Sequence, residues 1–307
     1  MNKILNVRPY YFRASGVRRK KVKKSKVLIF SVIAIMLISM LGACGNSNDK
    51  ASGEASGGDT SLEDLKERGE LVLGCDDAFP PMGFDDKGTL VGFDIDLARE
   101  VAKRIGVDFV PTAIDWKTKE LELTSNKIDV IWNGYTITEE RIGKVQFTKP
   151  YLENAQQVVV KADSDIKSLD DLKGKIIGFQ IESAASEVFE ASDLKGTEKA
   201  IQEYDDFQMA LLDLKSSDRV DAIIVDKILI EYAMQQDPGT FKTLAEPMGT
   251  EYFGIGCRPG EVALADAIDK ALDEMMEDGT IDEICAKWFE SNIVIRNVDR
   301  LTAADFK

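Results

Sequence analysis

The chain has 307 residues, enough for two domains of ordinary size, and its 44% hydrophobic and 30% charged residues are typical of a globular protein. The first 43 residues hold ten of the 39 basic residues and no acidic one, which leaves a net charge of −25 on the other 264 residues and disfavours binding to nucleic acid. There is no histidine, so histidine-based catalytic triads and imidazole zinc sites are excluded.

The N-terminal segment predicts an export signal. A basic block at residues 18–26 precedes residues 27–41, where only Ser31 and Ser39 are polar. This apolar run is shorter than the about 20 residues that cross a bilayer, and a basic flank with a short apolar core is typical of a signal peptide. We predict a signal peptide over residues 1–43, with an uncleaved membrane anchor as the alternative. Residues 44–60, rich in Ser, Gly, Asn and Asp, predict a flexible tether.

Strands and helices alternate along the rest of the chain. Apolar runs predict strands at residues 70–75, 107–110, 128–132, 157–160, 176–179 and 222–225. Helical spacing predicts helices at residues 94–105, 121–125, 183–191, 206–216 and 264–277. Thr280 and Glu283 predict a capping box that opens one further helix. This alternation predicts α/β lobes with largely parallel sheets.

Three cysteines, Cys75, Cys257 and Cys285, follow the N-terminal segment. A location outside the cytoplasm permits one disulfide and leaves one thiol over, and the sequence does not choose the pair. A buried free thiol is the alternative for each. Because the sequence has no phosphate-binding loop, nucleophile elbow or CxxC motif, we predict no catalytic residue, cofactor or metal site.

Residues 132–141 carry the most informative pattern. Asn133-Gly134 follows a predicted strand and lets backbone approach a ligand closely. Thr138 is a good N-cap, which places Arg141 in the first turn of a short helix. A guanidinium beside helical N–H groups suits a carboxylate, and a surface ion pair with Glu139 or Glu140 is the alternative. Earlier in the chain, the acids Asp94 and Asp96 are interpreted as ordinary helix-start residues rather than a cation site.

Several segments together resemble one family. Residues 132–141 (WNGYTITEER) are similar to the signature of the polar amino-acid-binding proteins of ABC importers, the family-3 extracellular solute-binding proteins. In the same order, four further segments match: residues 71–81 (LVLGCDDAFPP), 92–97 (GFDIDL), 173–178 (KGKIIG) and 278–289 (DGTIDEICAKWF). The resemblance covers roughly residues 61–289. Separately, residues 41–45 (LGACG) resemble a bacterial lipobox, which implies lipidation, for example with palmitate, at Cys44.

The family resemblance implies an α/β, two-lobed, periplasmic-binding-protein-like (type II) fold with the ligand in the interlobe cleft. Lobe 1 would comprise residues 61–150 plus 253–307, and lobe 2 residues 156–246, joined by hinge strands at 151–155 and 247–252. The expected protein is a monomer on the outer face of the bacterial membrane that closes like a Venus flytrap on a free polar amino acid. Its partners would be an ABC permease and the permease's ATPase.

Two other functions on the same scaffold are a ligand-sensing or receptor module and a dehydratase-like enzyme. The missing histidine and the complete set of groups for an amino acid argue against the enzyme.

The resemblance also implies roles for individual residues at the ligand's charged end. Arg141 would grip the α-carboxylate, helped by the backbone at Gly134 and Thr136, and Asp226 would take the α-ammonium. The physics agrees with these roles, because a zwitterion that leaves water needs both of its charges paired. Lobe closure would supply both partners at once.

The side-chain end of the ligand would meet a second group of residues. Phe79 and Trp116 occupy the positions whose rings sandwich the ligand side chain, and Asp76 and Asn133 face its far end. Asp76 suits an amide or a cationic side chain, so the identity of the amino acid stays open.

One loop departs from the family pattern. Where the family has Gln-x-Gly followed by two hydroxyl residues, this chain reads Gln-Ile-Glu-Ser-Ala at residues 180–184. Glu182 replaces the glycine and Ala184 lacks a hydroxyl, whereas Ser183 still caps the following helix. We expect the N–H groups at Ser183 and Ala184 to contribute to carboxylate binding.

Overall fold

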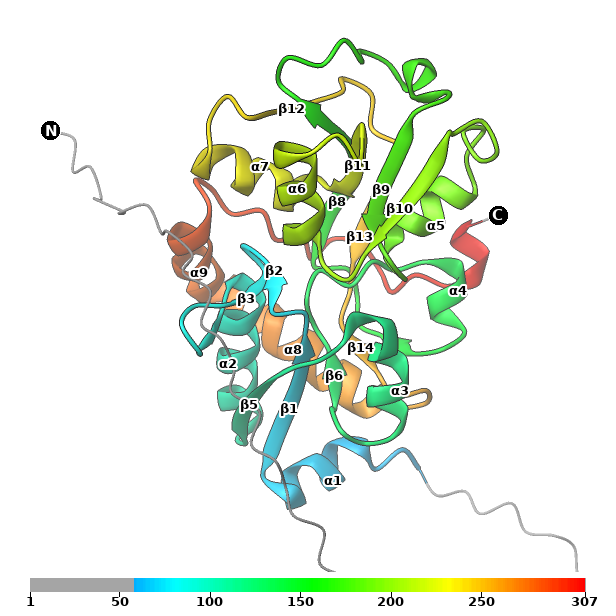
Figure 1. Ribbon diagram of the computed structural model, residues 1–307. Coiled ribbons are helices and arrows are strands. Elements are labelled where there is room, and N and C mark those ends of the chain that lie inside the picture. The colour runs from blue at the N-terminus through cyan, green and yellow to red at the C-terminus, as the bar shows by residue number, and fades with distance from the viewer. Residues whose placement is uncertain (1–57, 307) are drawn as a thin grey trace, which may run out of the picture. The chain divides into compact units, whose positions relative to one another are not determined.

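The computed structural model describes residues 58–306 (Figure 1). The predicted signal peptide, Cys44 and most of the predicted tether lie outside the described residues. The described residues belong to one compact unit with its own hydrophobic core. Within this part of the chain, no helix is both long enough and apolar enough to cross a membrane.

The first sheet has five strands in the order β5-β1-β6-β14-β7. These strands are β1 (Glu70–Cys75), β5 (Asp108–Ala113), β6 (Val130–Ile131), β7 (Gln146–Phe147) and β14 (Gly256–Cys257). β5 and β6 run parallel to β1, whereas β14 runs antiparallel to β6 and β7. The helices that pack on this sheet or on one another beside it are α1 (Ser61–Arg68), α2 (Phe93–Ile105), α3 (Lys119–Thr124), α8 (Val262–Glu277) and α9 (Thr280–Trp288).

The second sheet follows the order β10-β9-β11-β8-β12, with β13 also paired to β8. Its strands are β8 (Leu152–Lys161), β9 (Ile176–Gln180), β10 (Ala200–Tyr204), β11 (Ala222–Asp226), β12 (Phe241–Thr243) and β13 (Gly249–Phe253). The helices α5 (Ala184–Glu190), α6 (Phe207–Ser216) and α7 (Lys227–Gln236) pack against it. β9 is parallel to β10 and β11, but β8 is antiparallel to β11, β12 and β13.

Both sheets are therefore mixed, and the prediction of largely parallel sheets is wrong in this respect. The strands β8, β13 and β14 lie where the chain passes from one sheet to the other, and they pair antiparallel without a crossover helix. The α/β fold class itself is confirmed.

Most predicted elements are confirmed within a few residues, but several short ones were not predicted. The additional elements are α1, α7, the strands β7, β10, β12 and β14, a small sheet of β2 (Ala78–Phe79), β3 (Gly83–Asp85) and β4 (Leu90–Val91), and the short helices η1 (Trp116–Thr118), η2 (Leu169–Leu172) and η3 (Ala303–Phe306). The short helix predicted after Thr138 is confirmed as α4 (Glu139–Ile142).

The predicted capping box at the start of α9 is wrong. Gly279 precedes the helix in a left-handed conformation (φ 84°), and its carbonyl accepts from the N–H of Glu283 at 3.2 Å. The Thr280 hydroxyl donates instead to Asp278 Oδ1 at 2.6 Å. The glycine provides the turn that lets α9 follow α8 directly.

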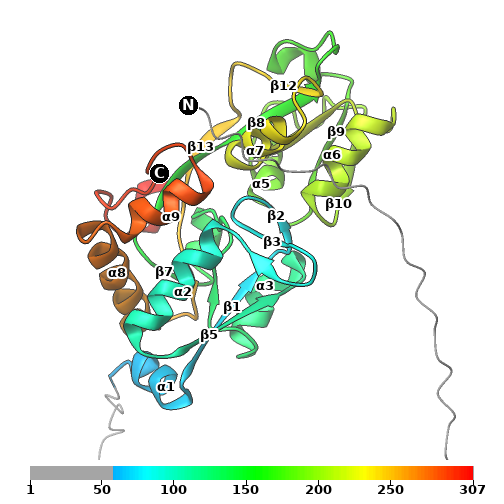
Figure 2. The same cartoon turned by 90° about the vertical axis from the view of Figure 1, so that its left-hand side faces the viewer.

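Two paired strands join the sheets. Figure 2 shows the second sheet above the first, with β8 and β13 passing between them. They are antiparallel, with Leu152 opposite Phe253 and Gln156 opposite Gly249. The ranges predicted as hinges, 151–155 and 247–252, fall on or beside this paired stretch, and their hinge motion stays a prediction.

The segment after α9 returns to the start of β8. Val294 forms an isolated β-bridge with Leu152, and the N–H of Ile295 donates to the carbonyl of Tyr151 at 2.9 Å. The tail therefore fixes the beginning of one of the two crossing strands.

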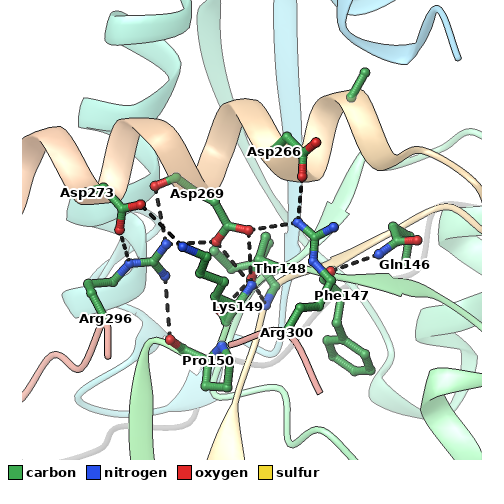
Figure 3. Close-up of polar contacts among 12 residues, drawn as sticks. Gln146, Phe147, Thr148, Lys149, Pro150, Asp266, Asp269, Asp273, Arg296 and Arg300 are labelled. Carbon is green, nitrogen blue, oxygen red and sulfur yellow. Dashed lines mark hydrogen bonds and ion pairs between the residues drawn. The ribbon is translucent and has the colours of Figure 1, made fainter. Parts of the chain in front are cut away.

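A cluster of ion pairs attaches this tail to α8 (Figure 3). We name it the C-terminal clamp; it consists of Lys149, Asp266, Asp269, Asp273, Arg296 and Arg300. The Asp269 carboxylate accepts from Arg296 and Arg300 at 2.8 Å each, and from the backbone N–H of Lys149 at 3.1 Å. The side chains of Asp269 and Arg296 are each only 7% exposed, so these charges are neutralised inside the chain.

The three cysteines of the described chain, Cys75, Cys257 and Cys285, are buried and free. The free-thiol alternative therefore holds for each of them, and no disulfide joins any two.

Candidate ligand-binding site

One small cavity lies between the elements of the two sheets. Residues near the first sheet line one side, and residues from the second sheet line the other. All ten ligand-binding residues predicted from the sequence line it, together with Gln180 and Phe207. The full set is Asp76, Phe79, Trp116, Asn133, Gly134, Thr136, Arg141, Gln180, Ser183, Ala184, Phe207 and Asp226.

Arg141 reaches the cavity from α4. The Thr138 side chain caps this helix by accepting from the N–H of Arg141 at 3.3 Å, as the sequence predicts. The Arg141 side chain is only 3% exposed, and the adjacent Glu140 pairs instead with Lys144 at 2.6 Å. The alternative interpretation of Arg141 as a surface ion-pair residue is therefore wrong.

The Arg141 guanidinium contacts two parts of the chain, the loop before α4 and the segment at the start of α5. Its NH1 donates to the carbonyl of Thr136 at 3.1 Å, and its carbon lies 4.9 Å from the centre of the Tyr135 ring. From α5, the Glu187 carboxylate pairs with NH2 at 2.7 Å, and NH2 also reaches the carbonyl of Glu182 at 3.4 Å. A carboxylate of the chain itself thus already occupies part of the fork that suits a ligand carboxylate.

The loop at Gly134 is fixed by a buried acid. Gly134 has a positive φ of 58°, and a Cβ there would lie 2.8 Å from the Phe79 ring, so only glycine fits. Its N–H donates to Asp94 at 2.8 Å, and the same carboxylate accepts from the Tyr151 hydroxyl at 2.9 Å. The N–H of Gly134 is therefore engaged within the chain and is not free for a ligand carboxylate. Burial raises the pKa of Asp94 to about 7, so its interpretation as an ordinary helix-start acid is incomplete.

Asp226 ends β11 and is only 5% exposed. Its Oδ1 accepts from the side-chain amides of Asn154 at 2.7 Å and Gln156 at 3.0 Å. Burial and the neighbouring carboxylate of Glu251 raise its pKa well above the ordinary value.

A second acid, Asp76, lies where the resemblance places the ligand side chain. Asp76 is 7% exposed and accepts from the N–H of Ala78 at 2.9 Å and from Gln180 Nε2, across the sheets, at 2.6 Å. Burial raises its pKa to about 6. Asn133 accepts from the N–H of Asp76 at 3.2 Å, while its own buried Nδ2 has no hydrogen-bond partner among the described residues.

Aromatic rings form the apolar walls. The rings of Phe79 of β2 and Phe207 of α6 lie 5.8 Å apart between centroids. Trp116 is 8% exposed, and the ammonium of Lys119 lies 5.2 Å from its ring centre. Such walls suit a flat or methylene-rich side chain and favour a cationic one.

The loop that departs from the family pattern keeps its helix cap. The Ser183 hydroxyl accepts from the N–H of Ser186 at 3.3 Å, and Ala184 begins α5. Glu182 adopts the left-handed conformation (φ 56°) that a glycine prefers, and its carbonyl accepts from Lys119 Nζ at 3.0 Å. Lys119 is buried, and burial together with nearby Arg141 lowers its pKa to about 8.

Several residues of the site were not predicted. Gln180 and Phe207 stand at a strand end and a helix start, the same kind of position as the predicted residues, so a search of all such positions could have found them. Lys119, Glu187 and Glu251 act through contacts between elements far apart in sequence, and no local pattern marks them.

The chain forms two α/β lobes, each built on a mixed sheet, and two paired strands join them. A cavity between the lobes holds a buried arginine and a buried aspartate, which defines a two-lobed small-molecule-binding protein. The chain belongs to the bacterial extracellular solute-binding proteins, family 3, whose family model matches residues 71–291.

Individual relatives agree with this family. The chain is 32% identical over 235 residues to the L-cystine-binding protein TcyJ of Escherichia coli (strain K12), covering 76% of this chain and 87% of the relative. It is 31% identical over 276 residues to the glutamine-binding protein GlnH of Bacillus subtilis (strain 168), covering 87% and 98%. A solved substrate-binding protein of an ABC uptake transporter from Streptococcus pneumoniae, with bound histidine, has a TM-score of 0.74 and 35% identity, covering 78% of this chain and 99% of that one. These relatives are binding proteins and not enzymes.

Proposed function

We propose that this protein captures a free polar amino acid outside the cytoplasm and delivers it to the permease of an ABC importer. The observation that carries the proposal is that Arg141 of α4 and Asp226 of β11, far apart in the sequence, line the same cavity. A zwitterion needs a cation for its carboxylate and an anion for its ammonium, and closure of the two lobes brings both together.

The lining of the cavity also narrows the ligand. Asp76 is a buried acceptor without an ion-pair partner among the described residues, and aromatic walls stand beside it. An amide, imidazole or guanidinium side chain would donate to Asp76 and lie against the rings. Among the ligands of the relatives, glutamine carries an amide and histidine an imidazole, and cystine ends in a second ammonium group, which is also a donor.

A lipid anchor at Cys44 would keep the protein on the membrane. The support is the lipobox-like sequence after a basic and apolar segment. At about 0.8 kcal/mol per buried CH₂, two or three acyl chains would hold a protein firmly. Cys44→Ser should move the protein from the membrane fraction to the soluble fraction, and an unchanged distribution would reject the anchor.

A ligand screen tests the central proposal. The chain without its first 44 residues should be unfolded, washed free of carried-over ligand and refolded, and then screened by thermal shift against the twenty amino acids, cystine and ornithine. We expect one or a few strong stabilisers, confirmed by calorimetry. If none of these compounds binds, the amino-acid proposal fails. Co-purification with a permease from membranes separates the importer from a receptor module.

A further inference from the structure

Behind Asp226 lies a second acid that does not line the cavity. Glu251 stands on the crossing strand β13, directly opposite Asn154 of β8. Its Oε1 accepts from Asn154 Nδ2 at 2.6 Å, from Gln156 Nε2 at 2.9 Å and from the Thr136 hydroxyl at 3.1 Å.

The two acids share their donors. The amides of Asn154 and Gln156 that bind Glu251 Oε1 also bind Asp226 Oδ1, and these two shared donors hold the carboxyl oxygens of the two acids beside each other. Asn154 is held in this orientation because its Oδ1 accepts from the N–H of Ile228 at 3.3 Å. Two carboxyl groups in such contact are compatible only when one of them carries a proton.

No positive charge of the described chain neutralises this pair. Neither Asp226 nor Glu251 forms an ion pair with any Lys or Arg among residues 58–306. β8 and the helices packed on β8 and β11 carry these charged groups: Glu153 and Lys161 of β8, Glu187 and Glu190 of α5, Asp213 and Lys215 of α6, and Lys227 and Glu231 of α7. Arg141 of α4 lines the same cavity as Asp226. Glu153 is exposed, and the others form ion pairs away from the two acids: Arg141 with Glu187, Lys161 with Asp218, Glu190 with Lys195, Asp213 with Arg219, Lys215 with Asp237, and Lys227 with Glu231.

We propose that Asp226 and Glu251 share one proton in the empty protein, and that this proton leaves to solvent when a ligand's ammonium group binds Asp226. The inference rests on the proposed amino-acid function. The ammonium supplies the positive charge that the chain itself does not, so both carboxyl groups become carboxylates and accept hydrogen bonds. Glu251 is a positioning residue that acts through Asp226.

The direction of the pH dependence follows from the same arrangement. Burial raises the pKa of both Asp226 and Glu251 in the empty protein, and a bound cation lowers the pKa of the pair again. Binding that expels a proton strengthens as pH rises, by up to about tenfold in Kd per pH unit while a full proton is released.

Calorimetry in two buffers counts the protons. L-Glutamine, L-arginine and L-histidine serve as probes at pH 7.5, where Asp76, with its pKa of about 6, is already largely ionised. Phosphate and Tris differ in ionisation enthalpy, so the difference in observed binding enthalpy gives the number of protons released. We expect release of up to one proton per bound ligand in the unaltered protein, and little or none in Glu251→Gln.

A matched control and a second readout keep the test decisive. Glu153→Gln removes an exposed carboxylate beside Asn154 on β8 and should release as many protons as the unaltered protein. If Glu251→Gln folds poorly, the affinity of the unaltered protein between pH 7 and pH 8 replaces it, and a flat profile overturns the proposal. Tight binding with equal proton release in Glu251→Gln also overturns it and leaves amino-acid binding intact. Absence of binding by every probe and by the full ligand screen would instead remove the proposed function on which the inference rests.

Discussion

Two regions of this molecule bury charge in opposite ways. In the C-terminal clamp, Arg296 and Arg300 both meet the Asp269 carboxylate at 2.8 Å, so positive and negative charges balance within the chain. At the cavity, Asp226 and, behind it, Glu251 share the amides of Asn154 and Gln156 and have no ion-pair partner among the described residues. The ion pairs of the clamp stabilise the fold, whereas the negative charge of the two acids is not neutralised until a cationic group of a ligand binds.

Arg141 stands between these extremes. It has one carboxylate partner, Glu187, which is on another element and 32% exposed at its side chain. Its charge is therefore balanced only partly, and by a group that can turn to solvent when a ligand carboxylate takes its place. We therefore expect substitutions in the C-terminal clamp to change the free energy of unfolding, and substitutions in the cavity to change amino-acid affinity.

The largest expected effect on stability is that of Asp269→Asn. This substitution leaves Arg296 and Arg300 without their shared carboxylate, and breaking a buried ion pair costs about 3–5 kcal/mol. Urea unfolding should show this loss in the free energy of unfolding, while amino-acid affinity stays unchanged. The control is Asp266→Asn, whose side chain is 63% exposed and which should cost less than about 1 kcal/mol. Equal losses for the two variants would contradict the role of burial.

Arg141→Ala should have the opposite effect, a large loss of amino-acid affinity and a smaller loss of stability. It removes the cation for the ligand carboxylate, and loss of one partner of a buried charge pair costs about 2–5 kcal/mol of binding, or roughly 30- to 5,000-fold in Kd. Its stability should fall less than that of Asp269→Asn, because the Glu187 left behind is 32% exposed and can be hydrated. Arg99→Ala, on an exposed arginine paired with Asp96, is the control. Wild-type affinity of Arg141→Ala in calorimetry would show that the cavity is not the site.

Local sequence was enough for much of the fold and of the cavity. Residues such as Asp226, at a strand end, and Arg141, in a capped first turn, are placed by short-range signals. The family segments then group such positions around one ligand. This is why all ten predicted residues line one cavity, although their contact with a ligand stays a prediction.

Pairings across the two sheets could not be predicted in the same way. Glu251 meets Asp226 only because β13 and β11 both pair with β8, and the length and partners of β8 are not encoded locally. Likewise, Asp94 has the pattern of a helix-start acid, and its contact with the Gly134 N–H appears only when α2 packs beside the loop. The ranges predicted as hinge strands fall on or beside β8 and β13, but for this reason the antiparallel pairing of these strands was not predicted.

Asp226→Asn should change the pH dependence of stability and, separately, weaken amino-acid binding. A carboxyl with a raised pKa contributes stability below its unfolded pKa, and this stability is lost as pH rises through the folded pKa. The variant cannot ionise at this position, so relative to the unaltered protein it should gain unfolding free energy as pH rises from 5 to 8. Its amino-acid affinity should fall at least about tenfold at pH 7.5, because an amide does not neutralise an ammonium. A pH-independent stability difference would mean that Asp226 is ionised in the empty protein.

The smallest expected effect is that of Glu187→Gln, which tests whether the partner of Arg141 competes with the ligand. Glu187 is partly exposed, so its ion pair with Arg141 contributes about 0.5–1 kcal/mol. A ligand carboxylate no longer has to displace this pair in the variant, so binding should strengthen by the same amount. We expect Kd to fall by roughly two- to fivefold in calorimetry. Glu190→Gln, on the same helix but paired with Lys195 at the surface, should leave Kd unchanged. Weaker binding by Glu187→Gln would mean that Glu187 holds the lobes together around the ligand. The charge of Arg141 would then be balanced within the chain, as the charges of the C-terminal clamp are, rather than left for a ligand.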